Sequence, residues 1–377
     1  MMRKFIFLII LMNICNLNAQ MKRAREYGIM IGILKTGEYN AITDVPGVRV
    51  GQVTIIKGDS VHTGVTAILP YAGNIFLNKV PAGIYIGNGF GKLTGYPQVE
   101  ELGNIETPII LTNTLSVPVA SEALIDYTLN LPGNENVKSV NPVVGETNDG
   151  GLNDIRGRHI TKDDVSQAIS EASSGPVKEG NVGAGTGTTC LGFKGGIGTA
   201  SRILPESRGG YTVGVLVQTN FGGILQIRGV PVGMELGRYR FREVSDEYKE
   251  DGSCMIVVMT DAPLSPKNLK RLAARSMFGI ARVGGIASNS SGDFAIAVST
   301  AEDLRIPYSA DSMFEEYKVL RNDRLDLLFE AVIEASEEAI INSLFAAETV
   351  TGKGNVRVES LPVEQTLEIL KIYNRLK

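Results

Sequence analysis

The sequence contains no tryptophan and only two histidines, His62 and His159, which lie far apart in the chain. Aromatic residues make up 6% of it and the net charge is −4, so it offers neither the stacking surfaces nor the basic face that nucleic-acid binding needs. So few histidines disfavour a Ser-His-Asp triad, and neither HExxH nor a CxxC pair occurs. We therefore expect no nucleic-acid partner and no metal or organic cofactor.

Cysteine is nearly as scarce, with Cys15, Cys190 and Cys254 as the three examples. The spacing of the last two does not predict a disulfide, and a chain of 377 residues can bury a core without one. Cys254 lies in an apolar run, which favours a small buried strand residue over the alternative of a catalytic thiol.

A long hydrophobic run stands at the N-terminus, within MMRKFIFLIILMNICNLNAQ. Residues 1–19 match a signal peptide, because two basic residues precede the apolar stretch Phe5 to Leu17 and Ala19 offers a cleavage position. The stretch is short for a membrane span, so we expect no stable membrane insertion. The pattern predicts an exported protein, periplasmic or secreted; a start at Met21 is the alternative.

Glycine, by contrast, is abundant, with 43 residues scattered through apolar segments. This distribution points to tight turns and close backbone packing rather than to disorder. Alternation predicts a strand over 48–55, and helical periodicity predicts helices over 116–129, 162–173, 264–284 and about 323–347, the last with an amphipathic face. Strands and helices alternate throughout. The order predicts one layered α/β domain over residues 20–377, with helices on both outer faces of packed sheets.

Two glycine-rich segments could suggest a phosphate-binding loop, and one acidic segment could suggest a cation site. GNGFGK and GAGTGTTC do not have the spacing of a phosphate-binding loop, and close backbone packing explains them better. The run NDGGLND, residues 148–154, could bind a hard cation, but a solvated loop with Asx turns is the more economical interpretation.

Ser253 lies directly before the apolar run CMIVVM, after Asp251 and Gly252. A serine can act without histidine if it is the N-terminus of a chain, because its own α-amine then serves as the base at a pKa near 8. That chemistry requires the Gly252–Ser253 bond to be cut. From the residues Asp-Gly-Ser alone, a plain turn before a strand is the commoner interpretation.

Several blocks in order carry a specific resemblance, among them NAITDVPGVRVG, ETPIILTNTLSV, NPVVGETNDGGLNDIRG, TVGVLVQTNFG, DGSCMIVVMTDAPL and NSSGDFAIAVST. Over nearly the whole mature chain the sequence resembles the DmpA-type self-processing aminopeptidases, the family of L-aminopeptidase/D-amidase-esterases and β-peptidyl aminopeptidases. The resemblance implies an αββα sandwich like that of N-terminal-nucleophile hydrolases, with DmpA-type connectivity. It also implies self-cleavage into residues 20–252 and 253–377, and a homotetramer of processed pairs.

The resemblance assigns the reacting groups position by position. It implies that Ser253 is the nucleophile of self-cleavage and of turnover, and that Asn220 donates to the oxyanion. Ser291 is implied to relay or orient the proton, with Asp293 holding its partners. Asp293 is shorter than the glutamate expected of related sequences.

The same resemblance places two residues at the substrate. Glu146 is implied to receive the free ammonium group of the substrate, which explains a requirement for an unblocked amine. Asn148 stands where some relatives are expected to carry a tyrosine that assists the oxyanion.

We thus expect a serine aminopeptidase that hydrolyses short peptides, amides or esters bearing a free N-terminal amine. Two alternatives stay open: an acyl transferase of the ornithine-acetyltransferase type, which self-cleaves at a threonine, and an exported binding protein on an inactive hydrolase fold. The residues do not distinguish α-peptides, β-peptides and D-residue amides as substrates.

Overall fold

A computed structural model describes residues 22–240, 242 and 252–376. The predicted signal peptide, residues 1–19, and residues 243–251 before the predicted cut lie outside the described residues. Among the described residues, no helix is both long enough and apolar enough to cross a membrane.

The smaller of the two main sheets has four strands in the order β1-β2-β5-β6. They span Arg49–Lys57 (β1), Val61–Leu69 (β2), Ile109–Asn113 (β5) and Val143–Thr147 (β6). The pair β5–β6 is parallel and the other pairs are antiparallel. The strand predicted over 48–55 is β1, extended by two residues at its C-terminal end.

The larger sheet runs in the order β13-β3-β12-β11-β10-β9, with β4 beside β3. Its strands span Asn78–Gly89 (β3), Asn104–Ile105 (β4), Ile197–Ile203 (β9), Thr212–Asn220 (β10), Gly252–Thr260 (β11), Ser291–Ser299 (β12) and Ile306–Pro307 (β13). The three central strands β10, β11 and β12 are buried along their entire length. Runs such as CMIVVM are apolar at every position because both of their faces are covered.

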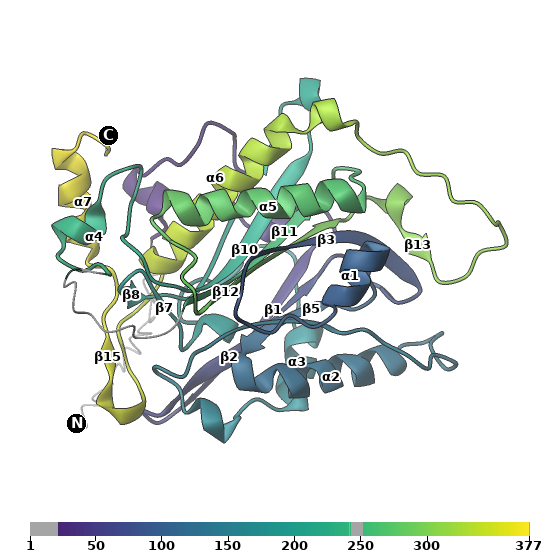
Figure 1. Ribbon diagram of the computed structural model, residues 1–377, viewed down its shortest axis with the longest axis horizontal. Helices are drawn as coiled ribbons and strands as arrows, with labels where there is room; N and C mark the ends of the chain where they lie inside the picture. Colours follow the sequence, from purple (N-terminus) through teal and green to yellow (C-terminus); the bar gives the residue numbers. More distant parts are fainter. Residues whose placement is uncertain (1–21, 241, 243–251, 377) are drawn as a thin grey trace, which may run out of the picture.

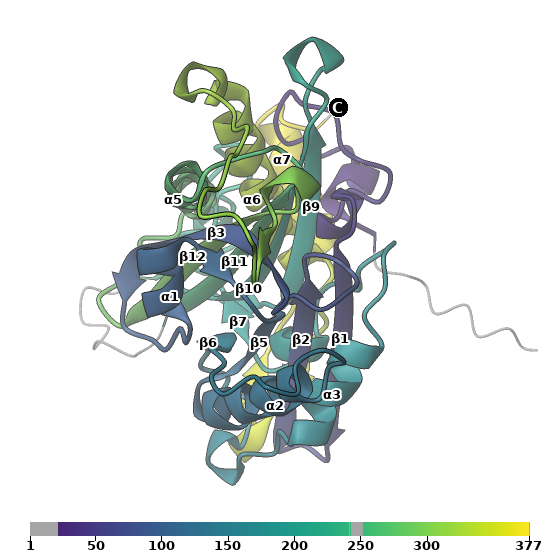
Figure 2. The ribbon, with the colours of Figure 1, turned by 90° about the vertical axis from the view of Figure 1, so that its right-hand side faces the viewer.

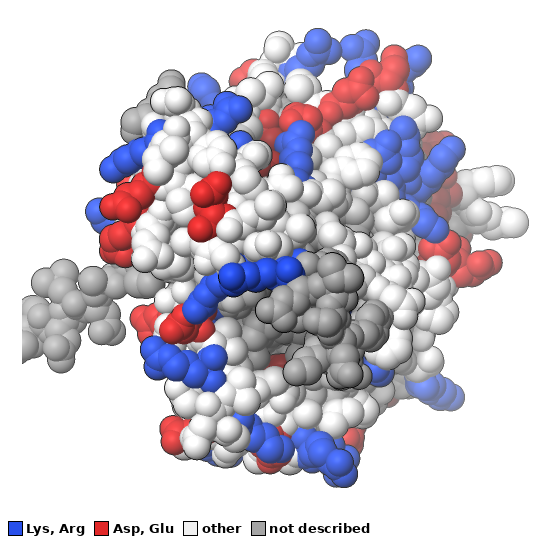
Figure 3. Space-filling model, turned by 60° about the vertical axis from the view of Figure 1, so that its left-hand side comes forward, with Lys and Arg blue, Asp and Glu red and all other residues white. Residues whose placement is uncertain are grey.

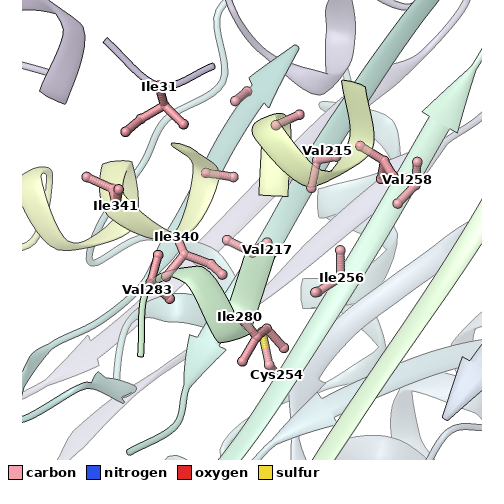
Figure 4. Close-up of a cluster of buried hydrophobic side chains, with 14 of the residues drawn as sticks. Ile31, Val215, Val217, Cys254, Ile256, Val258, Ile280, Val283, Ile340 and Ile341 are labelled. Atoms are coloured by element: carbon pink, nitrogen blue, oxygen red, sulfur yellow. The ribbon is translucent and has the colours of Figure 1, made fainter. Parts of the chain in front are cut away.

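Two pairs of helices cover the outer faces of the sheets (Figures 1 and 2). Helices α5 (Pro266–Arg282) and α6 (Asp326–Phe345) pack on the larger sheet, and α2 (Val117–Leu129) and α3 (Lys162–Ser170) pack on the smaller one. Three apolar layers result: one under α5 and α6, shown in Figure 4, one between the sheets, and one under α2 and α3. The predicted αββα sandwich is confirmed.

Helix α6 departs from the expected amphipathic pattern, since nearly every residue after Ile333 is buried. Its carboxylates are paired inside the protein. Glu334 and Glu338 accept charge-assisted hydrogen bonds from the fully buried Arg202 of β9 at 2.8 and 2.6 Å, and Arg25 also pairs with Glu338 at 2.6 Å. These acidic side chains therefore tie α6 to the sheet and to the N-terminal segment.

Shorter elements complete the chain. They are α1 (Tyr96–Leu102), α4 (Val232–Glu235), the hairpins β7 (Thr189–Cys190) with β8 (Phe193–Lys194) and β14 (Val350–Thr351) with β15 (Arg357–Val358), and α7 (Val363–Ile372). Helix α7 was not predicted, and α6 is therefore not the last helix. A long loop between β13 and α6 projects from the body (Figure 1) and exposes Met313 and Phe314.

Candidate active site

Ser253 is the second residue of β11 and lies between two central strands. It pairs with Asn220 at the end of β10 on one side and with Gly292 of β12 on the other. Met255, two residues on, belongs to the layer between the sheets, so alternation places the Ser253 side chain on that same inner face. The serine is 5% exposed. The strand thus presents it at the end of the inter-sheet layer.

The Ser253 hydroxyl lies against the peptide bond that precedes it. Its Oγ donates a hydrogen bond to the carbonyl oxygen of Gly252 at 2.6 Å. A Cβ on Gly252 would lie 2.8 Å from Ser291 Oγ and 3.2 Å from Ser288 Oγ, so these hydroxyls would have to turn away from it. Glycine at this position therefore lets two further hydroxyls approach the Gly252–Ser253 bond.

Asn220 is held by the backbone of two loops. Its Oδ1 accepts from the N–H of Thr189 at 3.0 Å, and its Nδ2 donates to the carbonyl of Asn148 at 2.9 Å. Because Asn220 and Ser253 are register partners, their side chains share the inner face of the sheet. The bond to Thr189 fixes the amide with its NH₂ group on the side of the smaller sheet.

Ser291 and Asp293 lie beside the start of β11 but on its other face. Ser291 pairs with Gly252, and Asp293 pairs with Cys254, whose side chain belongs to the layer under α5 and α6. Their side chains therefore lie on the opposite face of the sheet from the Ser253 hydroxyl. Among the described residues, neither the Ser291 hydroxyl nor either carboxylate oxygen of Asp293 has a hydrogen-bond partner. Burial raises the pKa of Asp293 to about 6, and the nearby Ser291 hydroxyl opposes that shift.

Glu146 is the fourth residue of β6 in the smaller sheet and is almost completely buried, with an exposed fraction of 2%. One carboxylate oxygen accepts from the backbone N–H of Lys92 at 2.9 Å, and the other accepts from the hydroxyl of Thr114. Burial raises the pKa of Glu146, and these two hydrogen bonds and the Lys92 charge lower it in part.

A glycine contact connects Glu146 with the strands around Ser253. A Cβ on Gly91 would lie 3.2 Å from Glu146 Oε1 and 3.3 Å from the Cα of Gly292, the register partner of Ser253. The carboxylate thus lies near β12, the strand that pairs with β11 at Ser253. An anionic group buried near the strand beside a serine suits a substrate that carries a cation near the bond to be attacked.

Asn148 contributes its backbone to the site. Its carbonyl receives the Asn220 amide, while its side-chain oxygen accepts from the N–H of Gly150 at 2.9 Å in an Asx turn. The neighbouring Asp149 accepts from Asn153 at 2.9 Å. The loop interpretation of residues 148–154 fits these bonds, and among the described residues no three metal-ligating side chains gather as a metal ion would need.

The two cysteines beside the site are free and buried. Burial raises the pKa of Cys190 to about 12 and that of Cys254 well above its ordinary value. A thiol that stays protonated is a poor nucleophile. Cys254 is therefore a packing residue of β11, as expected.

Three contacts at the site were not predicted: the N–H of Lys92, the hydroxyl of Thr114 and the N–H of Thr189. Two of them are backbone groups, which residue type does not reveal. The only available signal for Lys92 was the glycine-rich GNGFGK, in which Gly91, two residues after the end of β3, lets the chain approach β12 and Glu146 closely.

On the face shown in Figure 3, basic and acidic side chains are interspersed over the described surface. No single basic field covers that face, which agrees with the net charge of −4.

An αββα sandwich that places a serine at the start of a central strand, opposite an asparagine, defines the class of N-terminal-nucleophile hydrolases. The family model of Peptidase family S58 matches residues 40–358, and the chain belongs to this family. It is a serine aminopeptidase of that class, as predicted.

Known relatives agree over nearly the full length. The β-peptidyl aminopeptidase BapA of Sphingosinicella microcystinivorans is 43% identical over 95% of this chain and 94% of its own. A β-aminopeptidase from a Burkholderia species has 42% identity and a TM-score of 0.84, covering 93% of this chain and 99% of that one. The L-aminopeptidase D-Ala-esterase/amidase of Ochrobactrum anthropi, described as a variant of the Ntn hydrolase fold, has 38% identity and a TM-score of 0.86, covering 94% and 99%.

Proposed function

We propose that Ser253 is the nucleophile and that the protein cuts its own Gly252–Ser253 bond to free it. The hydrogen bond from Ser253 Oγ to the Gly252 carbonyl carries this proposal, because it holds the hydroxyl against the bond to be broken. Attack on the carbonyl carbon breaks the bond to the Ser253 nitrogen, which takes up a proton. Water then hydrolyses the resulting ester and leaves a carboxylate on Gly252 and a free amine on Ser253. The products are the chains 20–252 and 253–377.

Turnover repeats the same chemistry on a substrate. The Ser253 α-amine takes the proton of the hydroxyl as it attacks the substrate carbonyl. The Asn220 Nδ2, already oriented by Thr189, donates to the developing oxyanion. The leaving group departs with a proton, and water releases the acyl group. Ser291 and Asp293, beside Gly252 and Cys254, bear on the Ser253 amine rather than on the attacking hydroxyl.

Glu146 determines which substrates enter. A buried carboxylate that is already held by Lys92 and Thr114 stabilises a bound ammonium group and disfavours an amine whose charge has been blocked. The substrates are therefore short peptides, amides or esters with a free N-terminal amine. The printed activities of the relatives, a β-peptidyl aminopeptidase and a β-aminopeptidase, favour substrates with an N-terminal β-amino acid. Membership of a peptidase family favours hydrolysis over the acyl-transferase and binding-protein alternatives.

Export and assembly belong to the same proposal. The basic and apolar pattern of residues 1–19 supports export to the periplasm or beyond. The projecting loop after β13, with Met313 at 94% and Phe314 at 81% exposure, supports association with further copies of the chain, and a homotetramer is the state we propose.

A matched pair of substrates tests the function. The purified protein is assayed with β-alanyl and L-alanyl p-nitroanilides and with their N-acetylated forms. We expect release of p-nitroaniline from the free amines only, no activity in Ser253→Ala, and unchanged activity in the control Ser170→Ala, an exposed residue of α3. Equal rates for blocked and free amines, or an active Ser253→Ala protein, would refute the proposal.

A further inference from the structure

The side chain of Lys194 is fully buried close to the candidate site, although none of the proposed chemical steps uses it. It lies on β8, and its Nζ donates to the backbone carbonyls of Gly185 at 3.1 Å and of Gly195 at 2.7 Å. Burying an amine is unfavourable unless it is well hydrogen-bonded. The two carbonyls supply that compensation, so the lysine connects two points of the glycine-rich segment 185–195.

The segment that Lys194 connects is the one that holds Asn220. Lys194 pairs with Thr189 in the β7–β8 hairpin, and the Thr189 N–H donates to Asn220 Oδ1 at 3.0 Å. Around the same strand end, Gly195 N–H donates to Thr188 at 3.2 Å and Leu191 N–H donates to Phe221 at 2.7 Å. Thr189 is therefore fixed from both sides while it orients the amide.

Close packing leaves this segment little freedom to adjust. A Cβ on Gly185 would lie 2.3 Å from the nitrogen of Ile197. A Cβ on Gly195 would lie 2.9 Å from both Cys190 Cβ and Thr219 Oγ1. The backbone around both carbonyls is too closely packed for either carbonyl to turn and find a new donor on its own. Loss of the lysine's hydrogen bonds would therefore move the β7–β8 hairpin as a unit.

We propose that Lys194 is a positioning residue for the Asn220 amide, acting through the two carbonyls it holds and the Thr189 N–H. The inference rests on the proposed role of Asn220 as oxyanion donor. Lys194 contacts no reacting atom; it determines where the hairpin, and hence the Asn220 Nδ2, stands relative to Ser253.

The charge state of the lysine does not alter this role. Burial lowers the pKa of Lys194 to about 7, and the neighbouring Cys190 and Asp149 oppose that shift. Both the ammonium and the neutral amine have at least two N–H groups, which is enough for the two carbonyls. Positioning by Lys194 therefore holds on both sides of neutral pH.

The test combines Lys194→Met with Asn220→Ala in a double-mutant cycle on the processed, full-length protein. Methionine keeps the unbranched shape and removes the donors. Removing an oxyanion donor lowers kcat by about 10²–10³-fold, so a misplaced donor is expected to lower kcat by about 10- to 100-fold with KM little changed. In the Asn220→Ala background, Lys194→Met should lower kcat by no more than about threefold, because the group it positions is already gone.

Two further variants separate positioning from general stability. Lys194→Gln keeps two N–H donors on a shorter stem and should retain more kcat than Lys194→Met; if the methionine variant does not fold, the glutamine variant carries the cycle. Arg202→Met removes another fully buried cation, at the opposite end of β10 from Asn220, and should lower stability without lowering kcat of the folded enzyme.

The kcat values of these variants distinguish a failure of the role proposed for Lys194 from a failure of the role proposed for Asn220. Wild-type kcat in a folded Lys194→Met protein, or an equal loss with and without Asn220, would overturn the inference and leave Lys194 a packing residue. If Asn220→Ala alone leaves kcat unchanged, the role proposed for Asn220 fails instead, and the two failures are distinguished by that single variant.

Discussion

Replacement of Glu146 by glutamine is the most informative single change at the substrate end of the site. Glutamine has nearly the same shape and keeps an oxygen acceptor, but it removes the charge that faces the substrate ammonium. Truncating one partner of a buried, hydrogen-bonded charge pair costs about 2–5 kcal/mol. At about 1.4 kcal/mol for each factor of ten, kcat/KM for a free-amine substrate should fall about 30- to 4,000-fold.

Stability provides the internal control for that experiment. Burial raises the pKa of Glu146, so the folded protein binds its proton more tightly than the unfolded chain does. The wild-type carboxyl therefore contributes most to stability at low pH and less as pH rises through the folded pKa. Glu146→Gln removes this penalty, and its melting temperature at pH 8 should be equal to or above that of the wild type.

The assay compares kcat/KM for an alanyl p-nitroanilide in the wild type and in Glu146→Gln, with thermal melting of both proteins. A folded variant whose kcat/KM stays within about threefold of wild type would refute the role of the carboxylate as the amine receptor, because a buried charge pair is worth more than that.

Three other predictions follow from the same geometry. Asn220→Ala should lower kcat about 10²–10³-fold, as measured by steady-state kinetics, and an unchanged kcat would exclude Asn220 as the oxyanion donor. Because burial raises the pKa of Asp293 from 3.8 to about 6, the wild type loses stability as pH rises through that interval, and Asp293→Asn should raise the melting temperature more at pH 8 than at pH 4; an equal gain at both would contradict burial as the cause. Arg202→Met leaves Glu334 and Glu338 without a main partner and should lower the free energy of unfolding by about 3–5 kcal/mol in a urea titration at pH 7, and a loss below about 1 kcal/mol would contradict a structural role for the cluster.

Patterns of residues in the sequence were enough to predict most of the architecture. The helices over 117–129 and 162–170 fall within the predicted ranges, because capping and periodicity are local properties. The burial of α6 was not predicted, because Glu334 and Glu338 look solvent-facing until Arg202, 132 and 136 residues away in sequence, is placed beside them. Helix α7 was missed although Val363, Leu367 and Leu370 recur at helical spacing after Pro362, a local signal that the prediction did not use.

The site was predicted through family resemblance rather than through local pattern. By itself, Ser253 is a turn residue before a strand and Asn220 is a strand end. What the sequence could not show is how these residues are held: Thr189 and Lys92 contribute backbone N–H groups, and Asn148 contributes a carbonyl while its side chain closes a turn. Such contacts depend on where the chain passes in space and not on residue type.

An intact-mass spectrum of the purified protein beside Ser253→Ala shows whether Ser253 becomes an N-terminal nucleophile. We expect two wild-type fragments whose masses sum to that of the precursor plus one water, the smaller beginning Ser-Cys-Met-Ile, and a single uncut chain for the variant. A single uncut mass for active wild-type protein, or cleavage at this bond in Ser253→Ala, would contradict this role of Ser253.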